Sequence, residues 1–588
     1  MRVGACRWCP AIMFVAVLAS AASAFAAGSA RAPKLRYDLL VRSERIYDGS
    51  GNAPFAGELA IAGDRIVYVG VKAPGAAVRT INAGKAAVAP GFINMLSWSN
   101  ESLLVDGRAE SALRQGITLE VMGEGESMGP LTPDMKIDMK QRQEDDARYD
   151  VTWTTLDQYL RTLEGAGVAV NVASHVGAAT LRGYVMGDTA AKADPAQIAR
   201  MQELLRRAIE EGALGVASAL IYTPGTYADT GELTALAAEA GRCGGIYATH
   251  LRSEGDRFLE ALDEALAIAH ASGAPLHVYH LKVGGRANWP KMDAAIERIA
   301  SARAAGLAVT ADVYPYDASG TGLDAAMPPW VREGGVDAWV ARLQDGDTAR
   351  KVAAEMREPS SDWENVLAMA GADGAVVAGV KTEALQSLIG RRLSDIAAEW
   401  GVSPEVAAIR LVVEDKSRVA MVYRTMSEDN LRRLIQTPFV AFGTDAPAMV
   451  AEGAFLRNRQ HPRAYGTFAR VLGRYARDEG LIPLETAIHR MTGFPAQTLG
   501  LGDRGLLKPG YFADLVIFDA DTIQDHATFT DPHRYASGVR HVVVNGVEAI
   551  RDGQATNARA GKIVRGRGWK TPDGHGGCRA SPQAWSHP

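Results

Sequence analysis

The chain repeats one pattern, in which short apolar runs alternate with longer stretches whose apolar residues recur every three or four positions. A short apolar run is typical of a buried strand, and the longer spacing is typical of a helix with one face in the core. Eight such runs stand out in the central part of the chain. They are VAPGFINMLSW (88–98), TLEVMGE (118–124), VAVNVASHVG (168–177), LGVASALIYTP (214–224), GIYATHL (245–251), PLHVYHLKV (275–283), AVTADVYPY (308–316) and FVAFGTDA (439–446).

Eight strands with helices between them predict a (β/α)8 barrel of parallel strands, which we expect to span residues 88–507. A doubly wound open sheet is the alternative, but no glycine-rich phosphate-binding motif supports it. The stretch 317–438 is far too long for a single connection and contains amphipathic segments such as LQSLIGRRLSDIAAEW. We therefore expect an inserted, lid-like subdomain before the eighth strand.

The two ends of the chain carry strand–turn–strand patterns instead. They lie in residues 37–83 and in 513–521 and 539–553. Each is too small to form a core alone, so we predict one small β-sandwich built from 36–87 and 508–560. The remaining residues, 561–588, lack apolar periodicity and are predicted to form a disordered tail.

The first residues form a separate segment. Arg2 and Arg7 precede an apolar stretch, 11–26, that ends in the small-residue pattern Ala24-Phe25-Ala26. This arrangement predicts a cleavable signal peptide over residues 1–26 and therefore an exported protein, periplasmic or secreted. The apolar stretch is too short to anchor the protein in a membrane unless cleavage fails.

Charge and cysteine content narrow the picture further. The net charge is −5, which gives no indication of a nucleic acid or an anionic membrane as partner. Cys6 and Cys9 would leave with the signal peptide. Because Cys243 and Cys578 lie far apart in the sequence, we expect no disulfide framework and a fold held by its core.

The candidate chemistry starts from residues 247–283, which read as strand, helix and strand. Two apolar runs end in histidines, His250 and His280, and the helical pattern between them stops at Gly273. The strands of such a unit are parallel and adjacent, so the two histidines can converge on one metal ion. The alternative is a pair of structural histidines at a loop edge.

Two acids follow other strands of the predicted barrel, at the end where barrel active sites lie: Glu124 and Asp445. A catalytic zinc takes three protein ligands and keeps one position for water, which His250, His280 and a carboxylate would satisfy. The ion would lower the pKa of water to ~7. Asp445 fits the general base that takes the proton, with a turn aspartate as the alternative.

The sequence resembles the D-aminoacylase (N-acyl-D-amino-acid deacylase) branch of the amidohydrolase superfamily. The matching segments are APGFIN, LIYTPGTYADTGEL, YATHLRSEG, HLK, FGTDA, HPRAYGTFARVLGRYARDEG, MTGFPAQTLGL and DRGLLKPGYFADLVIFD. The resemblance implies that His250 and His280 bind zinc and that Asp445 is catalytic. It also implies that Lys282, Tyr314 and Arg463 bind substrate. The planar guanidinium of Arg463 suits a carboxylate.

One departure from the family concerns the first strand. Amidohydrolases usually carry a His-x-His pair there, but Leu96 and Trp98 occupy these positions. Neither side chain can ligate a metal, so we predict a single ion per chain.

A second departure concerns the metal-binding cysteine that D-aminoacylases carry after strand 2. Counting back from Pro130 places Glu124 at this position, and counting forward from Gly116 places Gly125 there. Since glycine cannot ligate, Glu124 is the first candidate and Glu126 the reserve. A carboxylate is a harder ligand than a thiolate, so the preference for zinc would be weaker.

These observations favour an exported amidohydrolase that uses one divalent ion, with zinc expected, to cleave N-acyl amino acids, the D enantiomers being favoured by the resemblance. A cyclic-amide or β-aspartyl dipeptide hydrolase is an alternative on the same fold. A binding protein without catalysis is an alternative of another class. The sequence leaves the acyl group, the side chain and the oligomeric state open.

Overall fold

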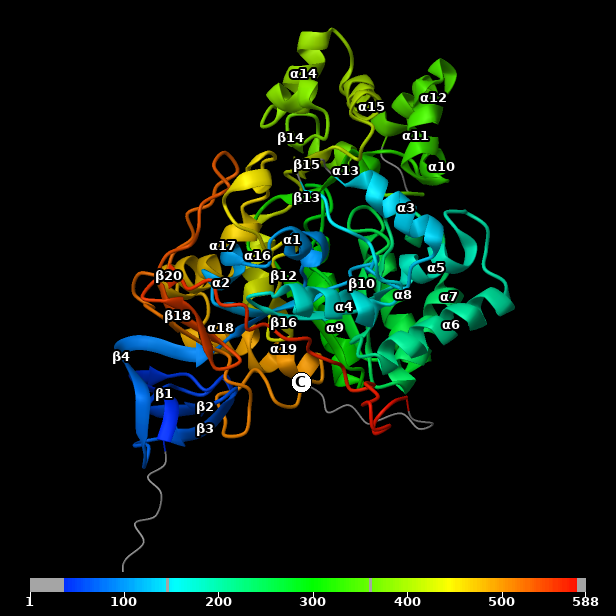
Figure 1. Ribbon diagram of the computed structural model, residues 1–588. Coiled ribbons are helices and arrows are strands. Elements are labelled where there is room, and N and C mark those ends of the chain that lie inside the picture. The colour runs from blue at the N-terminus through cyan, green and yellow to red at the C-terminus, as the bar shows by residue number, and fades with distance from the viewer. Residues whose placement is uncertain (1–35, 144–146, 359–361, 579–588) are drawn as a thin grey trace, which may run out of the picture.

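A computed structural model describes residues 36–143, 147–358 and 362–578. The strands of both chain ends pair in one eight-stranded sheet, at the lower left of Figure 1. The two ends thus meet in a single continuous sheet, and one hydrophobic cluster joins residues of both, among them Val41, Leu515 and Val543. The sheet order is β20 (Gln554–Ala555), β19 (Val547–Arg551), β18 (Val539–Val544), β17 (Leu515–Phe518), β4 (Ala76–Pro90), β1 (Arg36–Ile46), β2 (Phe55–Ala62) and β3 (Arg65–Gly70).

The centre of the molecule is built from parallel strands, and each of the eight predicted runs contains one. Those of the first sheet are β5 (Phe92–Asn94), β6 (Ile117–Met122) and β7 (Asn171–Ser174). Those of the second are β8 (Val176–Gly177), β9 (Gly215–Ala219), β10 (Ile246–His250), β11 (Leu276–Val278), β12 (Val309–Val313) and β16 (Val440–Phe442). His175 alone separates β7 from β8, so the third run is one interrupted strand.

Consecutive strands are neighbours throughout, and the last also meets the first. Met95 N donates to Phe442 O at 3.4 Å, and Asp445 N donates to Leu96 O at 2.9 Å. Ser97 forms a parallel bridge with Ala446. This order differs from that of a doubly wound sheet, in which strands are added to both sides of a central one.

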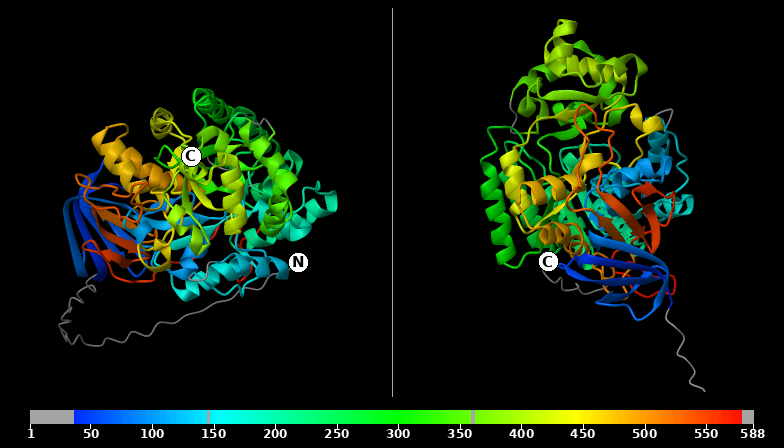
Figure 2. Two further views of the ribbon diagram at one scale, coloured as in Figure 1. Left: turned by 90° about the horizontal axis from the view of Figure 1, so that it is seen from above. Right: turned by 90° about the vertical axis from the view of Figure 1, so that its left-hand side faces the viewer.

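Helices connect these strands and cover them, as Figures 1 and 2 show. In α8, for example, Phe258, Leu262 and Ala269 are buried, and the helix ends at Gly273 in the left-handed conformation, as its sequence predicts. The helices of this part are α1 (Ser99–Val105), α2 (Glu110–Leu113), α3 (Pro133–Arg142), α4 (Leu156–Ala166), α5 (Ala178–Met186), α6 (Pro195–Glu210), α7 (Thr230–Arg242), α8 (Phe258–Ser272), α9 (Lys291–Ala304), α16 (Glu428–Gln436), α17 (Arg463–Arg470), α18 (Leu484–Met491) and α19 (Gly493–Thr498).

The segment between β12 and β16 has a sheet and a hydrophobic cluster of its own. It lies above the parallel strands in Figure 1. Its strands are β13 (Ser319–Gly322), β14 (Ala375–Gly379) and β15 (Ala420–Tyr423), and its α-helices are α10 (Pro329–Arg332), α11 (Gly335–Gln344), α12 (Gly346–Arg357), α13 (Val366–Ala370), α14 (Leu393–Trp400) and α15 (Pro404–Asp415).

The C-terminal residues contradict two predictions. Residues 561–578 are not a disordered tail, because their backbone bonds to the helix and strand ends that they pass: Val564 N donates to Val172 O, and Gly566 N to Gly212 O. In addition, Cys578 forms a disulfide with Cys243 at the end of α7, so the expectation of no disulfide was wrong. Residues 579–588 lie outside the described residues.

The predicted signal peptide, residues 1–26, also lies outside the described residues. Within the described ranges, none of the helices combines the length and the apolar character that crossing a membrane requires.

Candidate metal centre

Three side chains meet where strands of the parallel sheet end. His250 is the last residue of β10, His280 follows β11 by two residues, and Glu124 follows β6 by two residues. The carboxyl ends of parallel strands share one edge, which is why residues far apart in the sequence converge there. The burial of all three is nearly complete: Glu124 is 3% exposed, His250 4% and His280 2%.

Unusual backbone conformations and a buried aspartate position the side chains of Glu124 and His280. Gly123 has φ of +99°, and a Cβ there would lie 2.3 Å from the carbonyl oxygen of His175, so only glycine fits beside Glu124. His280 itself has a positive φ of 31°. Asp312 holds it in place, because one carboxylate oxygen accepts from His280 N at 2.8 Å while the other contacts His277 Nε2 at 2.8 Å.

The side-chain donor atoms are very close together. His280 Nε2 lies 2.9 Å from Glu124 Oε1 and 3.0 Å from His250 Nδ1, and His250 Nδ1 lies 3.2 Å from Glu124 Oε1. All three atoms fall within 4.8 Å of one another. Two imidazole nitrogens and one carboxylate oxygen are a donor set that suits zinc and similar divalent ions, so these residues fit a metal.

The electrostatics of the cluster are consistent with this use. Burial alone would raise the pKa of Glu124, but His280 and His250 beside it hold that pKa well below its usual value. Burial and Lys282 lower the pKa of His280, but Glu254, Asp445 and Glu124 outweigh them and raise it well above its usual value. The acids therefore draw positive charge to this point, either as a proton or as an ion that replaces it.

Glu254, which the sequence reading did not single out, contacts both histidines from the other side. Its carboxylate lies 3.1 Å from His280 Nδ1 and 3.6 Å from His250 Nε2, the nitrogens that face away from the triad. It also pairs with Lys282 Nζ at 2.7 Å. Glu254 lies in the loop after β10, four residues beyond His250, and the path of that loop, which the sequence pattern does not predict, brings its carboxylate to the histidines.

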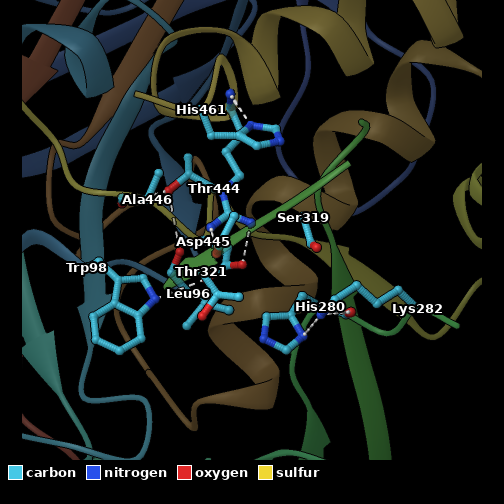
Figure 3. A network of polar contacts seen from close by, with 12 residues as sticks. Leu96, Trp98, His280, Lys282, Ser319, Thr321, Thr444, Asp445, Ala446 and His461 are labelled. Carbon is cyan, nitrogen blue, oxygen red and sulfur yellow. Dashed lines mark hydrogen bonds and ion pairs between the residues drawn. The ribbon is translucent and has the colours of Figure 1, made fainter. Parts of the chain in front are cut away.

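Asp445 lies beside the triad, three residues beyond β16, with φ of 48°. Trp98 Nε1 donates to its Oδ1 at 3.0 Å, and Figure 3 shows the indole beside the carboxylate. Arg463 Nη1 lies 2.6 Å from its Oδ2. Burial raises the pKa of Asp445, while Arg463 and His280 work in the opposite direction. Leu96 is fully buried, and its backbone oxygen accepts from Asp445 N.

A cavity of about 560 Å³ opens above these groups, between the strand ends and the inserted segment. The three predicted substrate residues, Lys282, Tyr314 and Arg463, all line it. The Arg463 guanidinium lies over the Tyr314 ring at 4.6 Å. Glu126, the reserve ligand, is exposed and lies outside both the triad and the cavity lining.

The sequence reading also missed the contribution of the inserted segment and of the loop after β9. Glu364 lines the cavity and accepts a hydrogen bond from the backbone nitrogen of Glu254, and burial raises its pKa to about 8. Tyr222 and Arg418 line it as well. No sequence pattern around Glu364, Tyr222 or Arg418 predicts that they line the cavity, because this depends on how the segment between β12 and β16 folds over the strand ends.

Fold and site together define a metal-dependent hydrolase. Residues 79–550 match the model of the amidohydrolase family, and the chain belongs to that family. It is thus a hydrolase that acts on carbon–nitrogen bonds other than peptide bonds.

Within this family, the chain is similar to several deacylases. The chain is 32% identical over 533 residues to the D-aminoacylase of Alcaligenes xylosoxydans xylosoxydans, covering 90% of this chain and 97% of the relative. The crystal structure of a D-aminoacylase is 30% identical, with a TM-score of 0.74, over 90% of this chain and 100% of that one. N-acyl-D-glutamate deacylase from Bordetella bronchiseptica, complexed with zinc and a phosphonate inhibitor, is 29% identical, with a TM-score of 0.73 and the same coverage.

Proposed function

We propose that this protein hydrolyses the amide bond of N-acyl amino acids, with the D enantiomers as substrates, and that it uses one divalent ion, expected to be zinc. The observation that carries the proposal is the buried convergence of Glu124, His250 and His280 beside Asp445, at the floor of a cavity. The relatives support the substrate class, since D-aminoacylase and N-acyl-D-glutamate deacylase match the chain over 90% of its length.

In this proposal Glu124, His250 and His280 hold the ion. A bound divalent ion supplies Lewis acidity, which polarises the substrate carbonyl and lowers the pKa of water. Asp445 Oδ2 accepts the proton of the attacking water and passes it to the leaving nitrogen. Trp98 keeps the carboxylate oriented by donating to Oδ1.

The substrate carboxylate competes with Asp445 for Arg463. Arg463 contacts Asp445, and its planar guanidinium can bind a carboxylate through two donors. When substrate takes over this contact, Oδ2 of Asp445 becomes free to accept a proton. Tyr314 is suited to the same end of the substrate, because its buried hydroxyl has no hydrogen-bond partner among the described residues.

We infer a single ion because Leu96 and Trp98 stand where the family resemblance calls for His-x-His. A buried leucine side chain and an indole whose nitrogen donates to Asp445 offer no ligand atom for a second metal. Neither a cyclic-amide or β-aspartyl hydrolase nor a non-catalytic binding protein is favoured, since a D-aminoacylase, an N-acyl-D-glutamate deacylase and an N-acyl-D-aspartate deacylase each match 90% of this chain at 32% identity.

Three further points of organisation belong to the proposal. We infer that the ring of parallel strands is a (β/α)8 barrel and that 317–438 is an inserted subdomain above its active-site end. We also infer export, on the strength of the apolar N-terminal stretch and of the disulfide between Cys243 and Cys578, because disulfides persist in oxidising compartments.

The test is a panel of N-acyl-D- and N-acyl-L-amino acids, assayed with metal-replete protein whose metal content is measured in parallel. We expect cleavage of D substrates and about one ion per chain. Cleavage of L enantiomers alone, or of no member of the panel, would contradict the proposal.

A further inference from the structure

A tyrosine ring packs near each of the two histidines of the triad, and an arginine side chain lies over each of these tyrosine rings. The Tyr314 ring lies 6.4 Å from the His280 ring, and Arg463 lies over Tyr314. On the other side, the Tyr222 ring lies 5.6 Å from the His250 ring. Arg418 lies over Tyr222, with its guanidinium carbon 5.0 Å from the ring centre.

Both arginines line the same cavity as the triad. They come from different parts of the chain. Arg463 begins α17, whereas Arg418 belongs to the inserted segment, two residues before β15. The proposed reaction uses Arg463 alone, and it leaves Arg418 without a role.

The surroundings of Arg418 leave its charge only partly neutralised. Its Nε lies 2.9 Å from Asp324 Oδ1, but Asp324 is shared with Arg332, whose Nη1 lies 3.7 Å from Oδ2. Glu126 also faces Arg418, while Arg142 adds a further positive charge beside it. The side chain of Arg418 is 49% exposed, and its contact with Asp324 is through the inner nitrogen, so its terminal nitrogens can meet a ligand in the cavity.

We propose that Arg418 is a second anion-binding site and that the preferred substrates carry two carboxylates. This inference rests on the proposed deacylase function. Arg463 binds the α-carboxylate of the amino acid, and Arg418 binds a second carboxylate of the same molecule. That group is either the side chain of an acidic amino acid or the far end of a dicarboxylic acyl group, since both present the same planar anion to a guanidinium.

Three substrates separate these sources: N-acetyl-D-leucine has no second carboxylate, N-acetyl-D-glutamate has one on the side chain, and N-succinyl-D-leucine has one on the acyl group. We expect kcat/KM for one of the two dicarboxylates to exceed that for N-acetyl-D-leucine by about 10-fold or more. This is the scale of a hydrogen bond to a charged group. Whichever dicarboxylate is preferred identifies the source.

Arg418→Gln should lower the ratio of kcat/KM for the preferred dicarboxylate to kcat/KM for N-acetyl-D-leucine by about 10-fold, and Arg418→Lys should restore part of this ratio. Arg410→Gln is the matched control. Arg410 belongs to the same segment, is 48% exposed, pairs with Glu414 and lies over Trp400, but it does not line the cavity. It should leave the preference unchanged.

Two results would overturn the proposal. One is an unmodified enzyme that cleaves N-acetyl-D-leucine as well as either dicarboxylate, a result that leaves the deacylase function standing. The other is an Arg418→Gln enzyme that keeps its preference or loses activity equally on all three substrates. A protein that cleaves none of them when loaded with metal would contradict the deacylase function itself, and this inference with it.

Discussion

Among single residues, Glu254 offers the sharpest test of how the metal ligands are positioned. Its carboxylate contacts the nitrogens of His250 and His280 that face away from Glu124. At 3.1 Å from His280 Nδ1, the carboxylate favours a proton on that nitrogen and so presents Nε2 of His280 to a metal. We expect Glu254→Gln to weaken zinc binding about 10- to 100-fold, measured by competition with a chelator of known affinity.

The zinc affinities of Glu126→Gln and Glu124→Gln give the two reference values with which that of Glu254→Gln is compared. Glu126 is exposed and outside the triad, so its variant should bind zinc as tightly as the original protein. Glu124→Gln should bind far more weakly, because a neutral amide replaces an anionic ligand. If Glu126→Gln loses the ion and Glu124→Gln keeps it, the ligand set is wrong. Unchanged affinity in Glu254→Gln would remove the positioning role.

Asp445 should be needed for catalysis and not for holding the ion, because it contacts Trp98 and Arg463 and lies outside the triad. We expect Asp445→Asn to keep its zinc and to lose about 10²- to 10⁴-fold in kcat, the usual contribution of a general base. Metal analysis and steady-state kinetics on the same preparation check both parts. A near-normal kcat would exclude Asp445 from proton transfer.

The side chains that were expected to converge lie close together where each directly follows an apolar run. Glu124, His250 and His280 could be found because the end of a parallel strand fixes where the next side chains lie. Glu254 could not, since its contact with the histidines depends on the path of the loop after β10. Arg418 was beyond reach for the same reason, as its position depends on the fold of the whole inserted segment.

At the scale of elements, the C-terminal segment 561–578 is the main departure from expectation. It lacks apolar periodicity, yet it is held by backbone hydrogen bonds to Val172 and Gly212 and by the disulfide of Cys578. Hydrophobic patterning does not predict such a segment, because it is held by backbone hydrogen bonds, by an ion pair between Arg565 and Asp157 and by few apolar residues, such as Val564. The spacing of Cys243 and Cys578 does not predict their disulfide either, because they lie 335 residues apart and only the fold brings them together.

Cutting this link should destabilise the molecule. We expect Cys578→Ser to lower the free energy of unfolding by about 2–5 kcal/mol, the usual effect of removing a native disulfide, seen as a lower denaturant midpoint. A reducing agent should lower the midpoint of the original protein by a similar amount and leave that of the variant unchanged. Equal midpoints for both oxidised proteins would mean that the disulfide adds no stability.

At the scale of the whole molecule, the sequence was most informative about the number of parallel strands and the order in which they pair. The eight apolar runs each contain a parallel strand, consecutive runs are neighbours, and both chain ends share one sheet. This follows from physical necessity, since buried strands must be apolar and short connections keep neighbours together. The length of the stretch 317–438 indicates that it is more than a connection, but its three-stranded sheet and its residues in the cavity lining could not be predicted from the sequence.

The central claim is that one ion, held by Glu124, His250 and His280, is needed for cleavage of N-acyl-D-amino acids. The most direct measurement is a titration of metal-free protein with Zn²⁺ while cleavage of an N-acyl-D-amino acid is followed. We expect almost no activity without metal and a linear rise that saturates at one equivalent per chain. Saturation only at two equivalents, or full activity in the metal-free protein, would contradict the claim.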